Sequence, residues 1–149
     1  MFSFLDSYSI YNESKDVEYS VRGRLNFGHY LEVYNKNNVV VGHIEQELFH
    51  MFHPTTNIYI GSNYLGNVRK KFTLFSEDYN IDFKGWTVEG DIFGFEYSIY
   101  DVNKNYIGSV SKELFHLTDH YVIDIKNESD ALIVLMFTLA IDAEKCSRK

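Results

Sequence analysis

Two groups of basic residues have the spacing needed to hold a phosphate. Arg22 and Arg24 are separated by one residue, so a strand through them would place both side chains on one face. Arg69, Lys70 and Lys71 are consecutive and follow an apolar stretch. Basic side chains in pairs bind phosphate oxygens through charge-assisted hydrogen bonds. We therefore take all five as candidate ligand-binding residues. The alternative is a solvated face, with residues 69–71 a polar bend of the chain.

Other chemistry has weaker support in the sequence. The histidines form two close pairs, His50 with His53 and His116 with His120, and neither pair has a third ligand at a convincing spacing. The carboxylates recur within an internal repeat, and there is no nucleophile motif or phosphate-binding glycine loop. We therefore expect no catalytic residue, no metal and no cofactor.

The internal repeat shows which elements position these residues. Residues 64–83 align with residues 106–125 without a gap, at a constant offset of 42, and a third copy begins at Val41. A partial fourth copy opens the chain within its first ten residues. The repeat predicts that one strand site, where backbones approach closely or the strand bulges, is occupied by a glycine in three copies: Gly42, Gly66 and Gly108.

Each copy has the pattern of two strands joined by a bend. Apolar and polar residues alternate in segments 58–60, 79–83 and 121–125, which is the period of half-buried strands. Turn-forming clusters such as 35–38 and 101–105 separate such segments. The spacing predicts about eleven or twelve short antiparallel strands over residues 1–128, in a barrel or sandwich.

One segment, residues 131–141, is an apolar stretch that contains no turn residue. Ser129 or Asp130 would cap a helix there, which we expect to run from about 129 to 145. Such a helix reaches roughly 22 Å, too short to cross a bilayer of about 30 Å. Because it is apolar on every face, protein must surround it. We predict one domain over residues 1–149, an all-β barrel enclosing this helix.

Composition limits the partners. The chain has 149 residues and a formal net charge of −7, which disfavours nucleic acid and general attraction to an anionic membrane. The single cysteine, Cys146, indicates a reducing compartment, and no stretch resembles a leader or a transmembrane segment. We therefore expect a cytoplasmic protein, with any membrane contact peripheral.

Three features of the chain carry a family resemblance: the strand openings at 20–23 and 87–90, the Asp-x-Tyr-x-Ile-Asp stretch at 119–124 and the final apolar helix. Together they resemble the LURP-one-related family of the tubby C-terminal-like superfamily. The similarity covers residues 2 to about 143 and implies a twelve-stranded β-barrel around a hydrophobic C-terminal helix. Relatives usually have a further strand before residues 2–4, so the first strand is expected to be missing or short, which would expose a sheet edge.

The resemblance also bears on function. Tubby proteins bind phosphoinositides through a basic pair on a strand, and the related scramblases act at membranes. We therefore predict a non-enzymatic binding or scaffold protein whose partner is a phospholipid headgroup or another protein. The alternative is an enzyme of unknown reaction with a pocket at a barrel end. An enzyme should have converging polar groups, a shifted pKa and a cavity of about 300 Å³ or more. The oligomeric state is left open.

Overall fold

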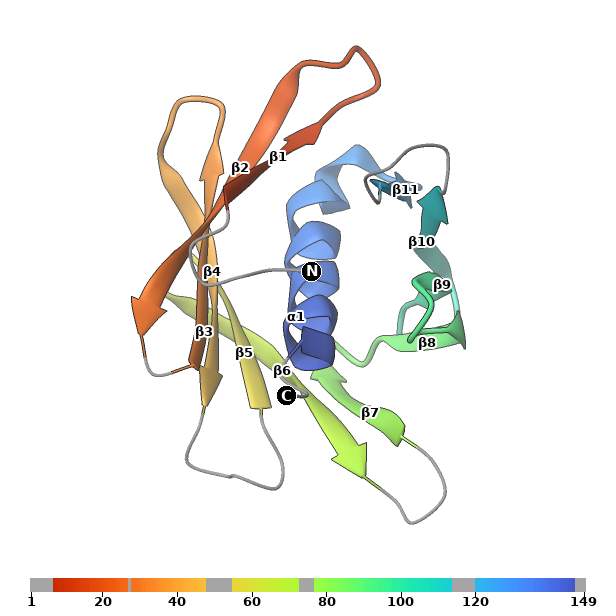
Figure 1. Cartoon of the computed structure of the whole chain (residues 1–149). Helices are drawn as coiled ribbons and strands as arrows, with labels where there is room; N and C mark the ends of the chain where they lie inside the picture. The colour runs from red at the N-terminus through yellow and green to blue at the C-terminus, as the bar shows by residue number, and fades with distance from the viewer. Residues whose placement is uncertain (1–6, 27, 48–54, 73–76, 114–119, 147–149) are drawn as a thin grey trace.

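The chain forms two antiparallel sheets with a long helix between them (Figure 1). The structure is a computed structural model and describes residues 7–26, 28–47, 55–72, 77–113 and 120–146. The larger sheet has seven strands in chain order: β1 (Ser7–Tyr11), β2 (Val17–Asn26), β3 (Gly28–Asn35), β4 (Val40–Glu47), β5 (Thr55–Ile60), β6 (Asn63–Phe72) and β7 (Glu77–Phe83).

The smaller sheet has four strands in the order β11-β10-β9-β8. Its strands are β8 (Thr87–Asp91), β9 (Glu96–Tyr100), β10 (Tyr106–Glu113) and β11 (His120–Ile125). A 3₁₀ turn, η1 (Glu128–Asp130), then leads into the helix α1 (Ala131–Cys146). The predicted count of eleven or twelve antiparallel strands and the predicted terminal helix are confirmed for the described residues. Ser129 and Asp130 lie within η1, so α1 itself begins after them.

Side-chain oxygens close the turns between neighbouring strands. In the β3–β4 turn, Asn35 Oδ1 accepts hydrogen bonds from the backbone N–H groups of Asn37 at 2.9 Å and Val39 at 3.0 Å. In the β9–β10 turn, Asp101 Oδ1 accepts in the same way from Asn103 at 2.8 Å and Asn105 at 2.9 Å. Asn and Asp favour such turns because their side chains replace hydrogen bonds that the bent backbone cannot make.

The helix α1 occupies the space between the sheets, as predicted (Figure 1). Every residue from Val134 to Glu144 is buried, whereas Ala131 to Ile133 are partly exposed. Phe137 contacts Phe83 of β7 and Trp86 of the β7–β8 turn, each with ring centroids 5.5 Å apart. An apolar helix surrounded by inward-facing strand residues is thus the centre of the hydrophobic core.

The prediction of one closed barrel is not confirmed. Pairings within the described ranges join β1 through β7 and β8 through β11, but no pairing joins β7 to β8 or β1 to β11. The tight turn at Lys84 and Gly85, both with positive φ, sends the chain from the first sheet into the second. The expectation about a further first strand falls on residues 1–6, which lie outside the described residues.

The glycine sites of the repeat share a close approach to a neighbouring strand. Gly42, Gly66 and Gly108 are all buried, and each stands beside a bulge in the pairing with a neighbouring strand. A Cβ built at each would meet a backbone carbonyl oxygen of the next strand, at 2.8 Å for Gly42 and at 2.5 Å for Gly108. A Cβ at Gly66 would come closer still to the carbonyl oxygen of Asp82, and Gly66 has φ of 150°. The predicted close backbone approach is confirmed.

Candidate functional site

Arg22 lies exposed on the outer face of β2, and neighbouring groups hold its guanidinium in place. Its Nη2 donates a hydrogen bond of 2.8 Å to Asn38 Oδ1, and its Cζ lies 4.2 Å from the centroid of the Tyr34 ring. Its cross-strand neighbour is Glu32 of β3. Arg24 follows two residues along the same strand, so its Cβ lies on the same face, but its side chain is outside the described part of the chain.

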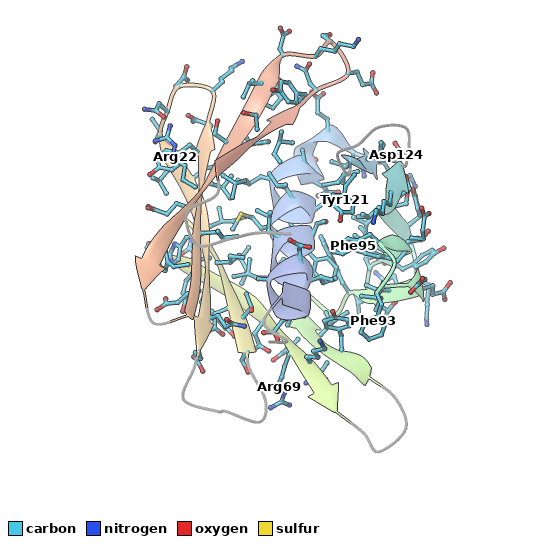
Figure 2. All side chains as sticks on the ribbon, in the orientation of Figure 1. Arg22, Arg69, Phe93, Phe95, Tyr121 and Asp124 are labelled. Atoms are coloured by element: carbon cyan, nitrogen blue, oxygen red, sulfur yellow. The ribbon has the colours of Figure 1, made fainter. Side chains whose placement is uncertain are left out.

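The run Arg69, Lys70 and Lys71 does not form one surface patch. The bend predicted here is instead the second half of β6, which continues to Phe72. Strand alternation therefore sends Arg69 outward, where it is half-buried, and Lys70 inward, where it is only 1% exposed. The side chain of Lys71 is not among those described. Figure 2 shows Arg69 near the end of β6, well separated from Arg22.

Lys70 instead belongs to a buried polar cluster at the end of α1. The other members are Glu144 on α1, Thr56 on β5 and Gln46 on β4, and all four side chains are at most 4% exposed. Thr56 Oγ1 donates a hydrogen bond of 2.7 Å to Glu144 Oε1. Because buried polar groups are costly unless they are paired, this cluster is a specific connection between the helix and three strands.

The protonation of Glu144 reflects this burial. Loss of hydration raises the pKa of the Glu144 carboxyl from 4.5 to about 7. Hydrogen bonds from Thr56 and from the Lys70 backbone, the charge of Lys70 and the side chain of Gln46 each oppose this rise. The sequence analysis missed Glu144. The signal available was its position on the predicted internal helix, where any carboxylate must find a partner.

A second polar group combines side chains of α1 with one from β7 and one from β9. It consists of Tyr79, Tyr97, Thr138 and Asp142, each at most 7% exposed. Burial raises the pKa of the Tyr97 phenol well above its usual range; a hydrogen bond with Thr138 lowers it, and Asp142 and Tyr79 raise it further. Thr138 Oγ1 also donates to the backbone carbonyl of Val134 at 2.8 Å. The contact between Thr138 and Tyr97 connects the helix to β9, whereas the bond to Val134 lies within the helix.

The outer face of β3 to β6 carries a row of rings: Tyr30, His43, Tyr59 and Tyr64. The rings of Tyr30 and His43 are 5.3 Å apart at 20°, and those of His43 and Tyr59 are 4.5 Å apart at 8°. Nearly parallel rings cover each other's faces, so this row stabilises the sheet as cross-strand pairs do. Tyr64 at the end of the row meets Tyr59 edge-on, at 5.5 Å and 61°, and is 52% exposed.

An open groove of about 310 Å³ lies over β8, β9 and β10. Its lining includes Glu89, Glu96 and three serines, and Glu96 Oε1 accepts a hydrogen bond of 3.0 Å from the Lys112 backbone N–H. Two carboxylates make the groove unsuited to an anionic headgroup. The carboxyl of Glu144, buried against β4 to β6, is not part of the groove lining.

Acidic, histidine and cysteine side chains are scattered over the described ranges. No three His, Cys, Asp or Glu residues there are placed to hold a metal ion together. His50, His53 and His116 lie outside those ranges, and the side chain of His120 is not described. No helix in the same ranges has the length and apolar character needed to cross a membrane.

Comparison with known proteins finds a matching family and a similar protein. A sequence model of the family described as LURP-one-related matches residues 1–142. The chain is also similar to the uncharacterized protein YxjI of Bacillus subtilis (strain 168), with 30% identity over 102 residues, which is 68% of this chain and 62% of that protein. The matched region thus spans less than two thirds of that relative's length. No solved structure matches the chain.

Proposed function

Because the chain belongs to the LURP-one-related family, and its own helix fills the space between its sheets, we propose that it is a non-enzymatic binding or scaffold protein. The observation that carries this proposal is the burial of Val134 through Glu144, which leaves a ligand the outer surface rather than an internal cavity. The candidate ligand is a phospholipid headgroup, with phosphoinositides the first to test.

Arg22 is the best-disposed basic residue for a headgroup phosphate. It is exposed, and its contacts with Tyr34 and Asn38 reduce the side-chain entropy that ligand binding would cost. Arg24 on the same face of β2 would supply a second charge. The net charge of −7 and the neighbouring Glu32 oppose an anionic surface, so binding would be local and weakened by salt.

The first prediction is tested with phosphatidylcholine vesicles that contain or lack a phosphoinositide. Wild type should sediment with the phosphoinositide vesicles at low salt, and less so as salt rises. Arg22→Glu removes one positive charge and adds a negative one, so at about 1 kcal/mol per charge near the surface it should weaken binding roughly thirtyfold.

Lys104→Glu is the matched control, because it makes the same charge change in an exposed turn of the other sheet. It should leave binding within about twofold of wild type. No sedimentation of wild type at low salt, or equal losses in Arg22→Glu and Lys104→Glu, would refute a headgroup site at Arg22.

The alternative, an enzyme, draws support from one observation, the buried Glu144 carboxyl with its raised pKa beside Lys70. General acids and bases are tuned by burial in this way. The groove of about 310 Å³ is nevertheless lined by other residues, so the perturbed carboxyl and the open space do not coincide. For this reason we place enzymatic activity second.

A further inference from the structure

The last turns of α1 bury acidic side chains, whereas its middle buries mainly apolar ones. The middle packs through apolar side chains such as Phe137, whereas Asp142 and Glu144 near the end are acidic and buried. Carboxylates at a helix C-terminus are disfavoured by the helix dipole. Burying them there therefore requires specific partners from the surrounding strands.

Three neighbouring strands supply those partners for Glu144. Thr56 of β5 donates its hydroxyl hydrogen bond at 2.7 Å, and the backbone N–H of Lys70 on β6 donates as well. The Lys70 side chain adds a positive charge, and Gln46 of β4 adds its amide. Glu144 is thus a single side chain through which the helix end is connected to β4, β5 and β6.

We propose that Glu144, together with Lys70, Thr56 and Gln46, forms a proton-sensitive latch that holds the end of α1 against β4–β6. Ionisation of Glu144 loosens this connection, because the cost of burying the charged carboxyl exceeds the stabilisation that Thr56, Lys70 and Gln46 give it. It concerns the interior of the fold and does not depend on a ligand at Arg22.

Other titratable groups around α1 are not placed to produce the same effect. Lys70 is the titratable member of the cluster on β4–β6, since Thr56 and Gln46 do not titrate. Asp142 on α1 acts on the Tyr97 phenol of the second polar group, as Tyr79 also does. On β11, Tyr121 packs against Phe95, with ring centroids 4.8 Å apart, and Asp124 is exposed (Figure 2).

The carboxylates of η1, Glu128 and Asp130, lie at the opposite end of the helix. At 1.5 Å per residue, Asp130 and Glu144 are about 21 Å apart along the axis. Glu128 is exposed, so it provides a control site for a carboxylate outside the cluster.

The direction of the pH effect follows from proton linkage. Burial raises the pKa of Glu144 from 4.5 to about 7, so between these values the folded chain keeps a proton that the unfolded chain releases. The stabilisation from this group is full below about pH 4.5 and is lost as the pH rises through 7. Between pH 6 and pH 8 the folding equilibrium constant should therefore fall roughly tenfold through this group.

The direct test is a carboxyl ¹³C NMR titration of the full chain labelled at glutamate, from pH 5 to pH 9. One glutamate resonance should titrate near pH 7, and it should disappear in Glu144→Gln but persist in Glu128→Gln. If no glutamate resonance titrates within about one unit of pH 7, or if the one that does survives Glu144→Gln, the latch is refuted. This titration uses the wild-type chain, so it stands even if a variant fails to fold.

Variants then test the partners. Lys70→Met and Thr56→Val remove interactions that lower the pKa of Glu144, so each should move the titration to higher pH. Urea denaturation should give the tenfold pH 6 to pH 8 change in wild type and Glu128→Gln but not in Glu144→Gln. A titration that moves to lower pH in Lys70→Met, or an unchanged pH dependence in Glu144→Gln, would contradict the proposal.

Discussion

At the scale of single residues, the chemistry of a side chain is decided by the face of the strand it occupies. Arg69, Lys70 and Lys71 suggest one basic patch in the sequence, yet β6 sends Lys70 inward to Glu144. Alternation along β6 could have revealed this, because Val68 and Lys70 share a face. The partner of Lys70 could not have been predicted, since Glu144 is distant in the chain and only the packed fold brings the two together.

The tight glycine sites could be predicted, because the repeat places glycine at the same position in three copies. Gly66→Ala should destabilise the chain by more than about 2 kcal/mol, since φ of 150° is strained for alanine and its Cβ would collide with the Asp82 carbonyl. Gly61→Ala has a positive φ of 60° but meets nothing within 4 Å, so it should cost only about 1 kcal/mol. Urea denaturation compares the two; equal losses would show that backbone approach at Gly66 is unimportant.

At the scale of elements, local patterns predicted the strands and the helix, but not whether the edge strands of the two sheets pair with each other. Alternation, turn clusters and the apolar stretch are local signals, and they predict the number of strands and place α1 near its observed bounds. Whether β7 pairs with β8, or β1 with β11, depends on long-range geometry that no local pattern contains. Local patterns alone therefore could not support the prediction of one closed barrel.

The contribution of α1 can be measured through its central aromatic residue. Phe137 is fully buried against Phe83 and Trp86, so Phe137→Ala should leave a cavity and cost about 3 to 5 kcal/mol. Trp86 is the single tryptophan, so its fluorescence reports the unfolding transition in urea. Val39→Ala, in an exposed turn, should change stability by less than about 0.5 kcal/mol. A Phe137→Ala loss as small as that of Val39→Ala would mean that the helix does not fill the core.

At the scale of the whole molecule, two sheets enclose a helix that belongs to the same chain. The interior is occupied by α1 and its polar contacts, while the outer face of the larger sheet carries Arg22 and the row of rings. The sequence predicted the internal helix from its uniform apolar character, which only a protein interior accommodates at this length. It could not predict which outer residues converge, because exposed charge imposes few constraints on a fold.

The central claim is that α1 is enclosed by the two sheets and leaves binding to the outer surface. Hydrogen–deuterium exchange of the full chain, measured residue by residue, tests it most directly. The amides of Val134 through Ala143 should exchange as slowly as those of the central strands β3 to β6, because both open only when the whole fold unfolds. Rapid exchange along α1 while β3 to β6 stay protected would contradict the claim, since it would place the helix outside the core.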